Sequence, residues 1–170
     1  MIDIVLADRG HIRAVLESLR EDDLLEMTAC DIDLDRLPDL IMRHKVFAFC
    51  AFDDDGPIAI WGMTKRRHGV GAGFAFGTER WSQAVIPMLR QIRRFVFPFL
   101  IYSDFHRVEA VALAHRLDVA KFMLLIGAFP EGVLVEYGSG REDFISYRWL
   151  ADEHAGTRAT LKAQDQHVTH

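Results

Sequence analysis

The chain has 170 residues, a formal net charge of −5 at pH 7, and 50% hydrophobic residues. This length allows one domain with a buried core, and the composition is typical of a globular protein in water. The negative charge argues against general nucleic-acid binding, which usually requires a basic surface. The start, MIDIVLADRG, lacks the pattern of a signal peptide, and no apolar stretch is long enough to cross a bilayer. With only two cysteines, Cys30 and Cys50, a disulfide framework is not expected. We therefore predict a cytoplasmic protein with neither membrane nor nucleic-acid partners.

The first third of the chain predicts one strand and several helices. Residues 2–7 alternate as a short strand, and Asp8 is placed to cap the helix that follows. Apolar residues in that helix recur at spacings of three and four. The segment LREDDLLEM extends or restarts the helix, and DIDLDRLPDLIMRHK indicates a loop and a short helix.

The middle of the chain predicts three antiparallel strands and a helix. KVFAFCAFDDDGPIAIWGMTKRR has the pattern of a hairpin with a turn rich in Asp and Gly, and HGVGAGFAFGT that of a third strand. These strands are expected near residues 46–52, 57–65 and 71–78. Pro87 suits the first turn of a helix, so we expect the next helix to begin there.

The segment HRVEAVALAHRLDVAKFMLLIGA, residues 106–128, predicts a strand that runs directly into a helix. His106 to Leu113 alternates like a half-buried strand, and from His115 apolar residues at helical spacing form one wide face. Gly127 stands where the helix should stop. A second hairpin, EGVLVEYGSGREDFISYRWL, follows, and residues 151–170 form a polar tail after a domain of residues 1–150.

The order of these elements predicts an α/β (α+β) fold. Antiparallel strands precede a strand-helix-strand-helix segment, so we expect a mixed, mostly antiparallel sheet of about seven strands with helices on both faces. The strand at 106–112 is expected to run parallel to its predecessor.

This order, with IGAF at the end of the 106–128 segment, resembles the GNAT superfamily of acetyltransferases over roughly residues 1–150. A narrower likeness comes from LREDDLLEM, GFAFGTERW and the Arg-rich helix after Pro87. In this order they resemble a GNAT-like family of short-tailed phages whose members are labelled internal virion proteins or acyltransferases.

The resemblance implies a site for acetyl-CoA between two diverging strands. Its candidates for holding the cofactor are Phe76, Gly77, Thr78 and Gln83. GNAT enzymes bind the pyrophosphate on a glycine-rich loop at a helix start, where backbone N–H groups point at the anion. GTERWSQAVIP, in the same place, lacks the second glycine, so acetyl-CoA binding is expected to be weak.

The resemblance also implies a general acid and a general base. Four residues before Gly127, where many GNAT enzymes have a tyrosine acid, this chain has Met123, which has no proton to donate. His115 is the substitute acid, with capping or surface exposure as the alternative. Glu79 is the candidate base, and a solvated loop acid is the alternative.

Three further groups of charged residues have two interpretations each. Arg20, Asp23 and Glu26 either form an ion-pair network or line a substrate groove. Glu109 is either a partnered structural acid or a catalytic one. KRRH, residues 65–68, either contacts the CoA phosphates or an acidic partner, or lies solvated in a turn. The histidines show no metal-ligand spacing, so no metal site is expected.

Two functions are compatible with this pattern. The first is a degenerate acyltransferase, encoded by a phage or prophage, that works as a virion-associated or assembly protein in the host cytoplasm. Its partners would be phage structural proteins or a second copy of itself. The alternative is an active acetyl-CoA-dependent N-acyltransferase. The lost glycine and Met123 favour the first, and the retained fold favours the second.

Overall fold

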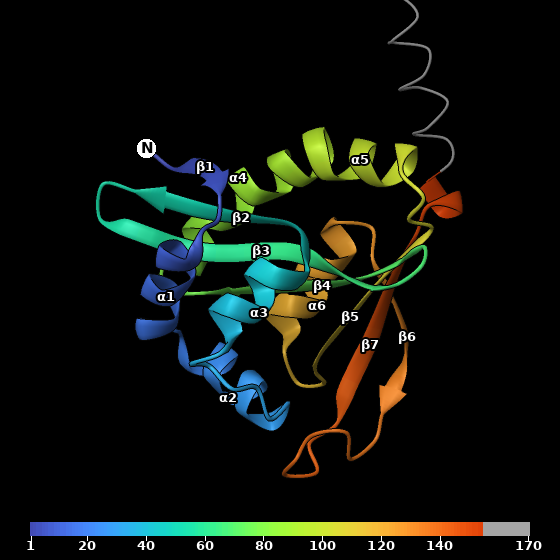
Figure 1. Ribbon diagram of the computed structural model, residues 1–170. Helices are drawn as coiled ribbons and strands as arrows, with labels where there is room; N and C mark the ends of the chain where they lie inside the picture. Colours follow the sequence, from blue (N-terminus) through green and yellow to red (C-terminus); the bar gives the residue numbers. More distant parts are fainter. Residues whose placement is uncertain (155–170) are drawn as a thin grey trace, which may run out of the picture.

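The structure, a computed structural model, describes residues 1–154 and arranges them around one seven-stranded sheet (Figure 1). The strands lie side by side in the order β1-β2-β3-β4-β5-β7-β6. In chain order the elements are β1 (Asp3–Leu6), α1 (Arg9–Glu17), α2 (Glu21–Ala29), α3 (Leu37–His44), β2 (Lys45–Asp53), β3 (Gly56–Arg67), β4 (Val70–Gly77), α4 (Trp81–Gln91), the π-helical turn η1 (Ile92–Val96), α5 (Phe97–Tyr102), β5 (Arg107–Leu113), α6 (Leu117–Leu125), β6 (Phe129–Leu134), β7 (Phe144–Leu150) and the 3-10 turn η2 (Asp152–His154). The predicted mixed sheet is confirmed: among these pairs β4–β5 is parallel and the others are antiparallel.

Helices cover both faces of the sheet, as predicted, and each face has its own apolar core. On one face Ile12 of α1 and Ile41 of α3 pack with Phe76 of β4. On the other, Met88 of α4 and Phe122 of α6 belong to a cluster around the central strands. Figure 1 shows α4 and α5 along one side of the sheet and α1 to α3 on the other. The two faces are thus covered by segments from different halves of the chain.

Two predicted helix boundaries are confirmed by their hydrogen bonds. The Asp8 carboxylate accepts a bond of 2.8 Å from the His11 N–H at the start of α1. After α6, Gly127 has a φ of +71°, and its N–H donates to the Leu124 carbonyl while the Ala128 N–H donates to Met123. This is the Schellman arrangement, which favours glycine because a side chain is strained at positive φ.

The helix expected to begin at Pro87 begins at Trp81 instead, so that prediction is wrong. The Thr78 carbonyl accepts from the Trp81 N–H, and the Thr78 hydroxyl accepts from the Arg80 N–H, which starts the helix early. Trp81, Ala84 and Met88 are buried along its inner face. Pro87 lies inside the helix, where it lacks an N–H, and burial of this apolar face outweighs that loss.

The apolar face predicted for the helix after β5 is mostly not buried. Leu117 is 71% exposed and Leu124 is 55% exposed, and Phe122 is the one residue of α6 that is buried. The expected helix also begins two residues later than His115, at Leu117. Helical spacing identifies a helix, but the packing of its neighbours decides how much of the helix is covered.

The strands β4 and β5 are joined for only a short distance. Their parallel pairing extends from Val70–Arg107 to Ala72–Glu109. Beyond it, β4 stays paired with β3 as far as Gly77, and β5 stays paired with β7 as far as Leu113. The two strands therefore diverge, and the sheet is split at its centre.

The predicted polar tail, residues 151–170, begins against the body of the protein. The Ala151 N–H donates to the His106 carbonyl at 3.0 Å, and Arg148 forms an ion pair of 2.7 Å with Glu153. Residues 155–170, the rest of this predicted tail, lie outside the described residues. Within residues 1–154, no helix has the length and apolar character needed to cross a membrane.

Candidate active site

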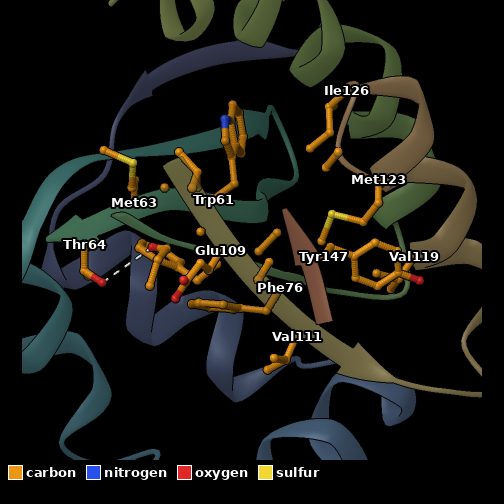
Figure 2. Close-up of a pocket in the computed structure, with 18 of the residues that line it drawn as sticks. Trp61, Met63, Thr64, Phe76, Glu109, Val111, Val119, Met123, Ile126 and Tyr147 are labelled. Atoms are coloured by element: carbon orange, nitrogen blue, oxygen red, sulfur yellow. Dashed lines mark hydrogen bonds between the residues drawn. The ribbon is translucent and has the colours of Figure 1, made fainter. Parts of the chain in front are cut away.

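A cavity of about 740 Å³ lies where β4 and β5 diverge, which is within the usual size of small-molecule sites. Residues from both faces of the sheet line it, because the split in the sheet connects the two faces. Figure 2 shows Phe76 and Val111 on one side and Val119 and Met123 of α6 on the other. The fold thus supplies a cleft at the position that the resemblance implied.

The edge of β4 that faces this cleft carries backbone N–H groups. Thr78 donates its N–H to Ile58 of β3, whereas Gly77 donates its N–H away from β3, to Asp23. Since backbone groups alternate along a strand, the N–H groups of Gly73 and Ala75 point the same way as that of Gly77. The last parallel pair of β4 and β5, Ala72–Glu109, uses the Gly73 N–H, so the Ala75 N–H is the one directed into the open cleft. The Ala75 N–H is suited to bind an extended polar chain that lies between β4 and β5.

A buried ion-pair network closes one end of the cavity. The Arg116 guanidinium, with a side chain 2% exposed, bonds Asp23 at 2.7 Å and Asp118 at 2.9 Å. Arg20 bonds the other oxygen of Asp23 at 2.8 Å. Arg116 also lies 3.5 Å from Glu26. The interpretation of Arg20, Asp23 and Glu26 as parts of an ion-pair network is confirmed, and the network lines the cavity. Their role in lining a substrate groove stays a prediction.

The network also binds the end of β4. An Asp23 carboxylate oxygen accepts the Gly77 N–H at 2.8 Å, and the Gly77 carbonyl accepts the Arg20 N–H at 3.0 Å. With the Thr78 N–H donated to Ile58, the backbone donors of Gly77 and Thr78 are both satisfied within the protein. Phe76 is 2% exposed, lines the cavity, and by alternation directs its N–H to β3.

The other predicted site residues lie outside the cavity wall. Glu79 and Gln83 are exposed at the start of α4, and His115 is exposed in the turn before α6. Their roles in acyl transfer stay predictions. Beside His115, sequence reasoning missed Arg116, which points inward. An arginine just before a helix carries no pattern that distinguishes a buried one from an exposed one.

Glu109 and the KRRH segment contact one another at the opposite end of the cleft. Arg107 bonds the Glu109 carboxylate at 2.8 Å, and Arg67 lies 3.4 Å from it. Burial alone would raise the pKa of Glu109, but these arginines hold it below its ordinary value. Glu109 is therefore a partnered acid. Among residues 1–154 no group of three or more His, Cys, Asp or Glu side chains could hold a metal ion.

Two titratable groups in the cavity are suited to proton transfer. Burial raises the pKa of Glu26, although the Leu113 N–H, donated to its carboxylate at 3.1 Å, and the charge of Arg116 act against that rise. Burial and the nearby charge of Glu26 raise the pKa of Tyr147. A carboxyl and a phenol with shifted pKa values in one cavity are typical of a catalytic site.

Tyr147 is the clearest residue that sequence reasoning missed. It is 3% exposed, lines the cavity, and its hydroxyl has no hydrogen-bond partner among residues 1–154. Figure 2 shows its ring in the cavity wall near Met123 and Val119 of α6. The alternation Ile145, Tyr147, Trp149 in FISYRWL could have indicated an inward-facing tyrosine, because Trp149 is buried on the same face.

Comparison with known proteins shows a shared fold. No protein-family model matches the chain, and no curated protein matches it. Among solved structures, a spermidine N-acetyltransferase from Vibrio cholerae, in complex with CoA and spermine, is 15% identical, with a TM-score of 0.64 over 91% of this chain and 98% of that one. The ribosomal-protein-S18-alanine N-acetyltransferase of Escherichia coli is 9% identical, with a TM-score of 0.65 over 89% of this chain and 94% of that one. Together with the split sheet and its cleft, these likenesses show that the chain has the fold of the GNAT acetyltransferases.

Proposed function

We propose that the protein transfers an acyl group from a thioester, such as acetyl-CoA, to an amine in the cleft between β4 and β5. The observation that carries this proposal is that one cavity holds both Glu26, a carboxyl with a raised pKa, and Tyr147, a phenol in the cavity wall that makes no side-chain hydrogen bond to residues 1–154. One neighbour with this fold, the spermidine N-acetyltransferase of Vibrio cholerae, was solved in complex with CoA and spermine, which supports a CoA thioester as the acyl donor.

In this mechanism Glu26 is the base and Tyr147 the acid. The Glu26 carboxylate takes a proton from the ammonium of the acceptor, and the free amine attacks the thioester carbonyl carbon. The new C–N bond forms, the C–S bond breaks, and Tyr147 gives its proton to the departing sulfur. The second proton of the new amide nitrogen passes to the Tyr147 phenolate, which restores the acid, and Glu26 releases its proton to water. The Ala75 N–H group would hold the arm of the thioester beside it.

The base role predicts a particular pH dependence. Because Glu26 must be ionised to act, and its pKa is raised, kcat/KM should rise with pH through a midpoint above that of an ordinary glutamate. Glu26→Gln should remove this rise and lower kcat/KM by about 10²-fold or more. The measurement is the rate of thioester consumption with an amine acceptor from about pH 4 to about pH 9. This pH range covers the usual range of shifted carboxyl pKa values in proteins.

Glu21→Gln is the matched control for the Glu26 variant. Glu21 lies on the same helix but is exposed and outside the cavity wall, so its replacement should leave the pH profile unchanged. A Glu26→Gln variant with the pH profile of the wild-type protein would remove Glu26 from the mechanism. If neither the wild-type protein nor the Glu21→Gln variant consumes the thioester with any amine acceptor tested, the proposed function is overturned.

Acetyl-CoA is expected to bind weakly. The N–H groups of Gly77 and Thr78 are already bonded within the protein, and the carboxylate of Glu79 lies at the start of α4, where it would repel phosphate. Each hydrogen bond to a charged group contributes about 1.5–3 kcal/mol, so the absence of these two bonds to the CoA phosphates should lower the affinity strongly. We expect titration calorimetry to give similar dissociation constants for acetyl-CoA and acetyl-pantetheine. A submicromolar value for acetyl-CoA alone would contradict this.

We also propose, as a second candidate, that the chain is a phage or prophage protein that assembles in the host cytoplasm or in a virion through contacts with a second copy of itself. The observation that favours contacts with a second copy is the outer strand β6, where Phe129 is 46% and Val133 is 60% exposed. β6 pairs with β7 on one side and forms the edge of the described sheet on the other. Exposed apolar edge strands are templates for pairing with another chain.

The assembly candidate predicts a dimer that depends on the β6 edge. Val133→Lys should convert it to a monomer, because a charge directed into an apolar interface is costly to bury. Light scattering after size exclusion measures the mass of each form. Leu6→Lys is the matched control, since Leu6 is 70% exposed on β1, at the other edge of the sheet. A monomeric wild-type protein would remove this candidate's support.

A further inference from the structure

The cavity continues from the ion-pair network into an apolar groove between the helices α2 and α3 and the sheet. Six side chains form this groove, from α2, the following loop, α3 and β4: Met27, Ile32, Leu37, Leu40, Ile41 and Phe74. Leu40 is 45% exposed and Ile32 is 37% exposed, so the groove is open and not filled by its own walls. A ligand here would meet aliphatic and aromatic surface along most of its length.

The charges around this groove leave one carboxylate with little compensation. Two arginines, Arg20 and Arg116, face three carboxylates in the network. Asp23 bonds both arginines at less than 3 Å, and Asp118 bonds Arg116 at 2.9 Å. Glu26 accepts the neutral Leu113 N–H at 3.1 Å, and its one contact with a cation in the network is that of 3.5 Å with Arg116. The excess negative charge of the network is therefore centred on Glu26.

The opposite end of the cleft carries positive charge. Lys65 and Arg66 line the cavity there, since Lys65 pairs with Gly71 at the start of β4 while Asp23 bonds Gly77 at its end. Glu109, the carboxylate at that end, already contacts Arg66, Arg67 and Arg107. A second ammonium group on a ligand would meet apolar walls or these cations.

We propose that the groove binds a primary monoamine with an apolar body, whose ammonium lies at Glu26 and whose alkyl or aryl part lies along α2 and α3. Its role as the acyl acceptor rests on the proposed function; its binding does not. Burial of the apolar part favours this ligand. A polyamine would instead have to bury further charges without carboxylates to pair with them, which is strongly unfavourable.

The test is equilibrium binding of two amine probes, hexylamine and spermidine, to the full-length protein at pH 7 by titration calorimetry. Hexylamine should bind at least about tenfold more tightly than spermidine. Glu26→Gln should weaken hexylamine binding by about tenfold or more, and Glu21→Gln should change it by less than about twofold. For the wall, Leu40→Ser should weaken hexylamine binding, and Leu24→Ser, on the outer side of α2 and 43% exposed, should not.

Each other outcome overturns the inference. The inference is overturned if spermidine binds as tightly as hexylamine or if neither probe binds. It is also overturned if the Glu26 and Glu21 variants weaken hexylamine binding equally. Turnover with acetyl-pantetheine distinguishes this failure from that of the proposed function. Hexylamine binding without turnover refutes acyl transfer and keeps the monoamine site, whereas turnover that prefers spermidine keeps acyl transfer and refutes the monoamine site.

Discussion

Replacing Arg116 with methionine is expected to lower the free energy of unfolding by about 3–5 kcal/mol. The Arg116 side chain is 2% exposed and bonds carboxylates on both α2 and α6. Methionine fills part of the same volume but leaves Asp23, itself 3% exposed, with Arg20 as its remaining cation. A buried carboxylate that loses its partner keeps its desolvation cost without the compensating attraction.

Urea unfolding followed by circular dichroism measures this loss, and Arg36→Met is the control. Arg36 also pairs with an aspartate, Asp33, but its side chain is 81% exposed. Exposed ion pairs contribute about 0–1 kcal/mol, so the control should unfold almost as the wild-type protein does. If the two variants lose equal stability, the buried network is not what holds α2 and α6 together.

Tyr147→Phe is expected to lower kcat by about 10²-fold or more while leaving the fold intact. The hydroxyl makes no hydrogen bond within residues 1–154, so its removal breaks no contact, and phenylalanine keeps the buried ring. The thiolate would then leave without an acid to protonate it. The fall in activity at high pH that reports ionisation of Tyr147 should disappear together with kcat.

Single-turnover kinetics and thermal unfolding of the same preparations separate these two effects. Tyr137→Phe is the matched control, because Tyr137 is 52% exposed and outside the cavity wall. We expect wild-type kcat and wild-type stability for the control. A Tyr147→Phe variant that keeps wild-type kcat would exclude Tyr147 as the acid, whatever its stability.

Most of the fold could be predicted from the sequence, because strands and helices are set by local periodicity. The alternation of residues 106–113, the helical spacing after it, the cap at Asp8 and the stop at Gly127 each depend on neighbours a few residues away. The order of these elements then limits the sheet to few topologies. The helix start at Trp81 differs from the prediction because proline is common in the first turn of a helix, which suggested a start at Pro87. In the structure Pro87 lies inside the helix, and burial of the apolar face compensates for its missing N–H.

The candidate site was predicted only in part, because its contacts join distant segments. Sequence spacing identified Arg20, Asp23 and Glu26 as one set, since they lie within two turns of one another. The partner that completes the set, Arg116, is 93 residues from Asp23. No local pattern encodes such a contact. His115, the exposed neighbour of Arg116 in the sequence, was the candidate acid because histidine commonly transfers protons near neutral pH.

What the sequence by itself determined is the set of secondary-structure elements and their order, and hence a mixed sheet, since each element follows from short-range periodicity and turn chemistry. What only the tertiary structure decided is which polar groups enter the cleft. Glu26 and Tyr147 come from opposite ends of the chain and meet one cavity because β4 and β5 separate after Ala72 and Glu109. Burial there shifts the pKa of both groups, and burial is a property of the packed fold rather than of either segment.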